Sequence, residues 1–407
     1  MKNQYKGAMT TQMLLLRFLP IVGLWLLLGV YVGYRLISPM SVRRTWKIIL
    51  WVCVAILLVL PILTMLVARG ANATHPVISF LPWPGFFAMG IVSIIFVFTL
   101  VRDVLLGVNW FVQMLLAKAR SERPLPQDPT RRKFIGNAVN FGIIGTTGVI
   151  AGSGARSALQ VPEVVEVDIP LVSLPADLEG FRIVQLTDIH VGPTIKSDYL
   201  TELVGKANAL SPDLIVVTGD LIDGHVHELA EHVAPLAKLT ARHGVYFVTG
   251  NHEYYWDAPA WIAYISSLGL RVLNNQHEVI SHQQSKLVIA GVTDASAGNY
   301  VPNHRSDPAK AFADAPTDLV RIFLAHQPRS FFAAENVAFD IQISGHTHGG
   351  QYFPMSVLVH LFQPFVAGLY RHSERWIYVS RGCGYWGPPI RFAAPTEISL
   401  IRLVRAY

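Results

Sequence analysis

The chain of 407 residues carries its charge unevenly, which divides it into two parts. Residues 1–158 hold 16 Lys and Arg against 3 Asp and Glu, a net charge of +13, whereas residues 159–407 hold 17 against 24, a net charge of −7. The second part lacks the basic surface of a nucleic-acid-binding domain, so no nucleic-acid partner is expected, and the two cysteines, Cys53 and Cys383, give no disulfide framework.

Three apolar stretches come first, at about residues 13–34, 48–68 and 86–106. Each is close to the roughly 20 residues that a helix needs to cross a bilayer. Buried core helices of a soluble protein are the alternative, but these stretches contain too few polar residues to face water. The pattern predicts an all-α transmembrane region of three helices over residues 1–117.

Residues 118–158 combine a basic loop with a fourth, weaker apolar stretch at 137–154, rich in glycine and small residues. The sequence TRRKF at residues 130–134 is similar to a twin-arginine export signal, with a pair of arginines and a Phe ahead of a mildly apolar run. An ordinary basic flank before a transmembrane helix is the alternative.

The cationic loops set the expected orientation. Loops 35–47 and 118–133 are rich in Lys and Arg, whereas loop 69–85 carries only Arg69. The positive-inside rule therefore places the first two loops in the cytoplasm and the chain beyond residue 155 outside. The sequence predicts a multi-pass protein of the cell membrane with an extracytoplasmic C-terminal domain.

From residue 159 onward, apolar runs of strand length alternate with helical patterns. Helical periodicity is present at 197–210 and 227–240, and a first strand is expected within 159–180. The other runs each end where a polar motif begins, and they cover residues 181–186, 214–218, 245–249, 286–292, 320–325 and 339–344. This alternation predicts an α/β domain over residues 159–407 with functional side chains at strand ends.

Side chains of the kind that bind metals stand in five short motifs of this domain, LTDIH, TGDLIDG, TGNHE, LAHQP and SGHTHGG. In an extended Asp-x-His segment both side chains point to one face, and flanking glycines let the backbone approach a metal or anion closely. Oxygen and imidazole ligands around two divalent metals are a common apparatus for cleaving phosphate esters. The ligand-type residues are Asp188, His190, Asp220, Asn251, His326, His346 and His348.

The order of these motifs, over about residues 180–405, resembles the calcineurin-like metallophosphoesterase family. The segments GHTHGGQ, GNHEYY and SRGCGYWGPPIRF are most similar to its membrane-anchored or exported bacterial phosphodiesterase branch. The resemblance implies a sandwich of two mixed β-sheets flanked by helices, with metals at one edge. It implies one metal on Asp188, His190, Asp220 and His348, and a second on Asp220, Asn251, His326 and His346. It also implies that His252 contacts the phosphate and protonates the leaving oxygen.

The function expected from the resemblance is hydrolysis of a phosphodiester by water that two divalent metals activate, on a lipid or other envelope phosphate. Ligation by oxygen and nitrogen without thiolates suits Mn²⁺, Fe or Zn²⁺ and does not choose among them. A membrane-anchored phosphomonoesterase and a non-catalytic metal-binding scaffold are the alternatives. The sequence gives no prediction of the oligomeric state.

Substrate contacts are less sharply indicated. Tyr254 is expected either to stack on a substrate or to pack at the start of a helix. Arg391 is expected either to reach an anionic substrate or to lie on the surface of an edge strand. Asp223 follows Asp220 closely enough to brace a ligand histidine. The apolar segment 352–370 fits either a lid that meets a bilayer or acyl chain, or a helix packed on the sheet edge.

Overall fold

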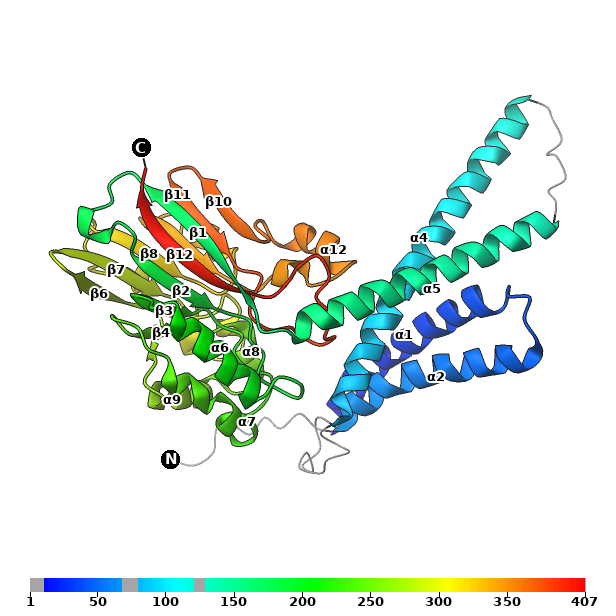
Figure 1. Ribbon diagram of the computed structural model, residues 1–407, viewed down its shortest axis with the longest axis horizontal. Coiled ribbons are helices and arrows are strands. Elements are labelled where there is room, and N and C mark those ends of the chain that lie inside the picture. The colour runs from blue at the N-terminus through cyan, green and yellow to red at the C-terminus, as the bar shows by residue number, and fades with distance from the viewer. Residues whose placement is uncertain (1–10, 68–79, 121–128, 407) are drawn as a thin grey trace. The chain divides into compact units, whose positions relative to one another are not determined.

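The computed structural model describes residues 11–67, 80–120 and 129–406 (Figure 1). The chain divides into two compact units, residues 1–152 and residues 153–407. The division falls within helix α5 (Pro129–Leu159), so the last turns of this helix belong with the second unit. That boundary lies a few residues before the domain start predicted at residue 159.

The described part of the first unit consists of long apolar helices at the four predicted stretches. They are α1 (Thr11–Ile37), α2 (Arg44–Val67), α4 (Pro82–Arg120) and α5, whose first residues include the predicted twin-arginine motif. By length and composition, four segments suffice to cross a membrane: Leu19–Ile37, Arg44–Leu66, Pro82–Ala119 and Lys133–Leu159. Large apolar side chains such as Leu24 and Leu27 are exposed along them.

A cluster of polar side chains joins α1 to α4. The Asp103 carboxylate accepts hydrogen bonds from Arg35 Nε at 2.5 Å and from Tyr31 Oη at 2.6 Å, and it pairs with Arg102 at 2.8 Å. Ionisable groups within apolar helices are costly unless they are paired. These contacts satisfy the charges that interrupt the two helices.

The second unit contains two six-stranded mixed sheets, which confirms the predicted fold class. The first sheet has the order β1 (Glu163–Leu171), β12 (Glu397–Arg405), β2 (Arg182–Leu186), β3 (Leu214–Val217), β4 (Val245–Phe247) and β5 (Arg271–Val272). The second has the order β10 (Gly368–His372), β11 (Arg375–Val379), β9 (Ile341–Ser344), β8 (Val320–Leu324), β7 (Ser285–Gly291) and β6 (Gln276–His282).

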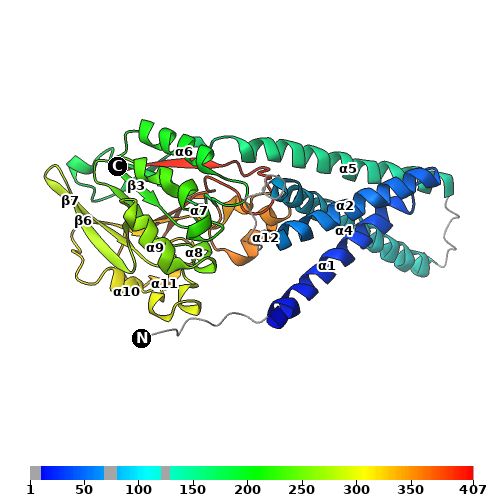
Figure 2. The same cartoon turned by 90° about the horizontal axis from the view of Figure 1, so that it is seen from below.

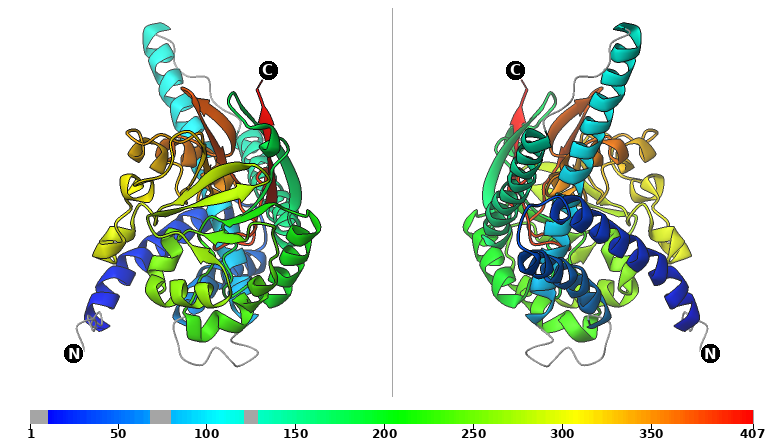
Figure 3. Two further views of the ribbon diagram at one scale, coloured as in Figure 1. Left: turned by 90° about the vertical axis from the view of Figure 1, so that its left-hand side faces the viewer. Right: turned by 90° about the vertical axis from the view of Figure 1, so that its right-hand side faces the viewer.

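Successive side chains of a strand point to opposite faces of its sheet, and here both faces carry apolar side chains. The two sheets therefore pack face to face (Figure 3). On β2, Ile183 points between the sheets, whereas Val184 points to the outer side. Three helices, α6 (Ser197–Ala209), α7 (Val226–Val233) and α9 (Ala258–Ser267), cover that outer side (Figure 2). The outer side of the second sheet packs against α10 (Pro308–Ala311) and α11 (Ser330–Ala333).

The helix expected at 227–240 is shorter than its periodicity indicates. α7 ends at Val233, and a 3₁₀ helix, η2 (Ala234–Lys238), continues the segment. Pro235 lacks the N–H that the next hydrogen bond of an α-helix would use, although Ala234 before it still has helical geometry, with φ −49° and ψ −31°. The proline therefore accounts for the early end of α7.

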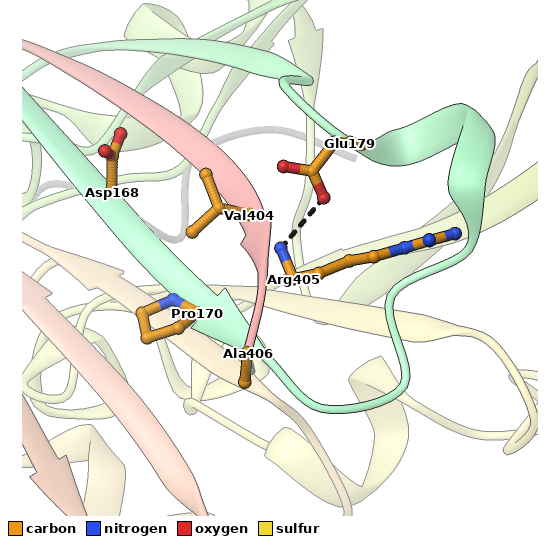
Figure 4. Close-up of a pocket in the computed structure, with 6 residues that line it drawn as sticks. All are labelled: Asp168, Pro170, Glu179, Val404, Arg405 and Ala406. Carbon is orange, nitrogen blue, oxygen red and sulfur yellow. Dashed lines mark hydrogen bonds between the residues drawn. The ribbon is translucent and has the colours of Figure 1, made fainter.

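Strands β2, β3, β4 and β5 run parallel, as do β7, β8 and β9, so their carboxyl ends gather at one edge of each sheet. β12 runs antiparallel to β2, and its own carboxyl end lies at the opposite edge. A surface pocket at that opposite edge is lined by Asp168, Pro170, Glu179, Val404, Arg405 and Ala406 (Figure 4). None of these is a predicted site residue.

Candidate metal centre

Three neighbouring strands of the first sheet each lead into a predicted motif. β2 is followed by Asp188 and His190, β3 by Asp220, and β4 by Asn251 at the start of α8 (Asn251–Tyr255). Because parallel strands end at the same edge, these side chains converge although they are far apart in sequence. A backbone hydrogen bond from Asp188 N to Gly219 O, at 3.1 Å, joins the first two loops.

The second sheet contributes the remaining candidates in the same manner. His326 follows β8, and His346 and His348 follow β9, with His348 at the start of the 3₁₀ helix η5 (His348–Gly350). The carboxylate of Asp188 accepts a hydrogen bond from His346 N at 2.9 Å, which ties the two sheets together at this edge. A Cβ on Gly345 would collide with that carboxylate, so only glycine allows this approach.

Five of the seven candidate ligands have a left-handed backbone conformation, with positive φ. Such residues cost roughly 1–3 kcal/mol each and persist only where the surroundings hold them. The φ values are 52° at Asp188, 56° at His190, 49° at Asp220, 74° at His346 and 53° at His348. Backbone strain at several residues whose side chains converge is typical of a functional site.

The first group of donor atoms comprises Asp188, His190 and His348. The Nε2 atoms of His190 and His348 face each other at 3.0 Å, and His348 Nε2 lies 3.4 Å from Asp188 Oδ1. Asp220 Oδ2 lies 4.0 Å from His190 Nε2. This is a set of imidazole and carboxylate donors around one point.

The second group comprises Asp220, His326 and His346. His326 Nε2 lies 3.2 Å from Asp220 Oδ2 and 3.2 Å from His346 Nδ1. His326 Nδ1 donates to Thr218 O at 2.8 Å, so Nε2 is the ring nitrogen that faces the other two groups. Asp220 thus stands between both sets of donors.

Asn251 supplies the most direct test of whether these residues suit a metal. Its Oδ1 is buried and has no hydrogen-bond partner, while its Nδ2 donates to Tyr255 Oη at 3.3 Å. A buried polar oxygen without a partner is costly, and a cation would satisfy it. Together with the opposed imidazole nitrogens, this oxygen makes the donor set fit divalent metals that prefer oxygen and nitrogen ligands.

His252 lies beside the two groups and shares a carboxylate with His190. Asp223 accepts hydrogen bonds from His252 Nδ1 at 2.5 Å and from His190 Nδ1 at 3.0 Å. Both rings therefore direct Nε2 inward, and His252 Nε2 lies 3.9 Å from Asp220 Oδ2. The brace that the sequence suggested for Asp223 is present, and it orients two rings rather than one.

Glu253 is a residue that the motif analysis did not single out. It is fully buried, and its carboxylate accepts from Asp220 N at 3.1 Å, Leu221 N at 2.8 Å and Gly250 N at 2.5 Å. These bonds hold the loop of Asp220 against the loop of Asn251. The sequence signal available was a glutamate directly after Asn-His, three residues beyond the glycine that precedes α8.

Protons on histidine side chains balance the charge of the buried carboxylates at the candidate centre. Burial acts to lower the pKa of His326, but the carboxylates of Asp220 and Asp188 raise that pKa to about 10. Burial also opposes the charge on His252, whose pKa Asp220 and Asp223 raise to about 9. His346, buried next to the cationic His326, has its pKa lowered to about 3. Divalent cations would replace these protons as the compensating charge.

Arg391 differs from the sequence expectation. It is 1% exposed and therefore not a surface arginine on an edge strand. Its guanidinium donates to His348 O and Arg381 O, each at 2.8 Å, to Gly384 O, and to His348 Nδ1 at 2.8 Å. The loop that closes over it could not be foreseen from local sequence. Arg391 therefore positions His348.

The tyrosine expected to contact substrate is also buried. Tyr254 Oη contacts His304 Nδ1 at 3.1 Å and accepts a hydrogen bond from Thr249 Oγ1 at 3.4 Å, which corresponds to the packing alternative. Tyr255 is exposed instead, with its ring centroid 4.9 Å from that of His252. Trp386 lies against His252 as well, at 5.6 Å between ring centroids, and is also exposed.

Residues 181–350 match the calcineurin-like phosphoesterase family. An uncharacterized metallophosphoesterase of Helicobacter pylori strain J99 is 34% identical over 282 residues, which are 68% of this chain and 73% of that protein. The chain belongs to the calcineurin-like phosphoesterase family. A transmembrane protein with metallophosphoesterase domain from Danio rerio is 41% identical over 268 residues, 64% of this chain and 61% of that protein.

The matched part is therefore less than two thirds of the Danio rerio protein. Among solved structures, a dimetal phosphatase from Danio rerio is 14% identical and covers 50% of this chain and 88% of its own, with a TM-score of 0.32. That likeness is too weak to inform the site. Family membership agrees with the predicted resemblance and with the donor groups at the sheet edge.

Proposed function

We propose that the chain is a metal-dependent phosphodiesterase. The observation that carries this proposal is the unsatisfied Oδ1 of Asn251 among opposed imidazole and carboxylate donors at one sheet edge. One metal would be held by Asp188, His190, Asp220 and His348, and a second by Asp220, Asn251, His326 and His346. Bound cations would polarise the phosphoryl group and acidify the attacking water. Carboxylate and imidazole ligands suit Mn²⁺, Fe or Zn²⁺, and Mn²⁺ is our choice for the tests.

The side chains around the cations have separate tasks in this proposal. His252, raised in pKa by two carboxylates, holds a proton on Nε2 and donates it to the leaving oxygen. Asp223 keeps the Nδ1 proton of that ring in place. Exposed Tyr255 and Trp386 on either side of His252 would form the rim over which a substrate enters.

The scarcity of arginine and lysine side chains at the centre favours a diester over a monoester. A monoester brings up to two negative charges, whereas a diester brings one. Among the hydrogen bonds of the described candidate ligands, the one arginine partner is Arg391. Its guanidinium donates to backbone carbonyls and to His348. A singly charged phosphate therefore fits this environment better.

We further propose that residues 1–158 anchor the enzyme by several membrane spans and that residues 159–407 act at the outer face on a lipid or envelope phosphate. The four apolar helices and the relative named as a transmembrane protein support the anchor. The excess of Lys and Arg in loops 35–47 and 118–133 supports the orientation. The twin-arginine-like sequence at 130–134 supports export of the following domain.

The test uses the full-length protein in lipid nanodiscs, stripped of metal and then supplied with Mn²⁺. Bis-p-nitrophenyl phosphate and p-nitrophenyl phosphate serve as the diester and monoester. We expect Mn²⁺-dependent turnover that favours the diester, falls in Asp220→Ala and His252→Ala, and is retained in the exposed control His227→Ala. Preference for the monoester would indicate a phosphomonoesterase. Mn²⁺ binding without turnover of either ester would indicate a scaffold.

A further inference from the structure

Helix α12 (Met355–Phe362) carries an exposed apolar face in the second unit. Val359 is its one buried residue, and it exposes Met355, Val357, Leu358, Leu361 and Phe362. Leu361 is 75% and Phe362 66% exposed. Residues 341–370 contain no Asp, Glu, Lys or Arg. A helix with one buried residue gains little from packing against its own domain, and its apolar face is suited to a partner that is itself apolar.

The exposed face is joined to the candidate metal centre through a short chain of contacts. α12 begins a few residues after His348, and a Cβ on Gly350 would collide with the backbone of Ser356, so η5 and α12 are packed tightly. Gln351 donates from Nε2 to Trp386 O at 3.0 Å and accepts from Trp386 N at 3.0 Å. The Trp386 ring then meets His252 edge-on at 79°.

Aromatic and apolar side chains thus continue from α12 to the rim of the centre. Trp386, Tyr255 and Tyr300 are about half exposed, and Tyr255 and Tyr300 meet at 5.7 Å between ring centroids. Trp and Tyr with one wet and one apolar side are the residues favoured at the interface between a membrane and water. The surface formed by α12, Trp386, Tyr255 and Tyr300 is called the apolar rim below.

The chain itself indicates what meets the apolar rim. The segment Lys133–Leu159 is long and apolar enough to cross a membrane, and its last residues, from Ser153 on, already belong to the second unit, where Ala158 lies in the core. The same helix leads from the candidate span directly into the second unit. The second unit is therefore tethered close to a bilayer if the proposed anchor is correct, whichever side of the membrane it occupies.

We propose that the apolar rim docks on the bilayer surface, with α12 partly inserted, and that the enzyme takes amphiphilic phosphodiesters directly from that bilayer. An interfacial helix buries its apolar face roughly 5–10 Å into the boundary between headgroups and acyl chains. Docking brings His252 to the level of lipid phosphates. The inference rests on the proposed phosphodiesterase function and on the membrane anchor.

The first test measures the depth of α12 in nanodiscs made of phosphatidylcholine and phosphatidylglycerol. A Cys53→Ser protein carries a nitroxide at Leu361→Cys or, as control, at Val172→Cys in the turn after β1, where Val172 is 80% exposed. We expect the label at 361 to collide with dissolved oxygen more than with a water-soluble nickel chelate, and the label at 172 to do the reverse. Docking is overturned if the label at 361 is as accessible to the nickel chelate as the label at 172. It is also overturned if the label at 361 is buried against a second chain.

The second test separates docking from catalysis. Hexadecyl p-nitrophenyl phosphate, held in the bilayer, and methyl p-nitrophenyl phosphate, dissolved in water, share the same leaving group. Leu361→Glu combined with Phe362→Glu should reduce the ratio of hexadecyl to methyl turnover at least tenfold, because the free energy of burying two large apolar side chains exceeds the roughly 1.4 kcal/mol that a tenfold change requires. Val172→Glu should leave the ratio unchanged.

The possible results of the second test distinguish failure of the phosphodiesterase function from failure of docking. If neither ester is hydrolysed by the wild-type protein with Mn²⁺, the proposed phosphodiesterase function fails. If the methyl ester is hydrolysed and the charged double variant keeps the wild-type ratio, docking of α12 fails while the phosphodiesterase function stands. If the double variant does not fold, the position of the nitroxide at 361 still decides the proposal.

Discussion

Replacing Glu253 by Gln should loosen the centre while every candidate ligand side chain is kept. The carboxylate accepts three backbone N–H groups, two on Oε2 and one on Oε1. A glutamine keeps the shape but turns one of these oxygens into an NH₂ group, so it loses at least one hydrogen bond and sets a donor against the N–H of Leu221. A hydrogen bond contributes about 0.5–1.5 kcal/mol net, and a buried unpaired N–H costs about 1–3 kcal/mol. Taken together, we expect a destabilisation of about 2–4 kcal/mol.

Thermal unfolding of the full-length metal-free protein, followed by near-ultraviolet circular dichroism, measures this effect. For a domain of this size, 1 kcal/mol shifts Tm by about 2–4 °C, so Glu253→Gln should lower Tm by roughly 5–15 °C. The matched control is Glu335→Gln, because Glu335 is exposed and such surface changes stay within about 0.5 kcal/mol. Equal Tm values for the two variants would refute the idea that Glu253 holds the Asp220 and Asn251 loops together.

Three further outcomes are expected. Asp223→Asn leaves one acceptor oxygen for the ring N–H groups of His190 and His252, so it should reduce Mn²⁺ affinity or turnover about 10–100-fold. Asp318→Asn, at an exposed position, should reduce neither, and Mn²⁺ titrations of the two variants in parallel test this. Arg391→Lys loses the forked guanidinium that donates to His348, so metal affinity should fall while KM for the diester stays constant. A raised KM with unchanged metal affinity would indicate that Arg391 contacts the substrate. Mn²⁺ at 100 times its Kd should stabilise the protein by about 2.7 kcal/mol per site, measured as a rise in Tm that Asp220→Ala abolishes.

The positions of the candidate ligands were predictable because they follow from local pattern. Apolar runs such as 214–218 end at a polar motif, and parallel strands bring their carboxyl ends to one edge, so Asp220 and Asn251 had to lie close together. The four apolar helices were predictable for the same reason, since their length and composition are local properties. Pro235 also gave a local signal for the end of α7, which periodicity alone obscured.

Other features depend on contacts between distant segments. Glu253 acts on backbone N–H groups of the Asp220 loop, more than thirty residues earlier, and no spacing rule reveals such a bond. Arg391 looked like an anion-binding or surface residue because nothing in PPIRF shows that the loop carrying His348 closes over it. Tyr254 and Tyr255 are adjacent and chemically alike, and only the position of α8 decides which of them is exposed. Burial of single side chains was therefore the least predictable property.

The central claim is a pair of metals bridged by Asp220, and electron paramagnetic resonance of the Mn²⁺-loaded protein tests it most directly. Metal-free protein receives two equivalents of Mn²⁺, and the spectrum is compared with those of Asp220→Ala and His348→Ala. Two ions about 3.5–4 Å apart are magnetically coupled, so the wild-type spectrum should show the multiline signal of a coupled pair, and both variants should lose it. A six-line signal from isolated Mn²⁺ in the wild-type protein would contradict the two-metal centre.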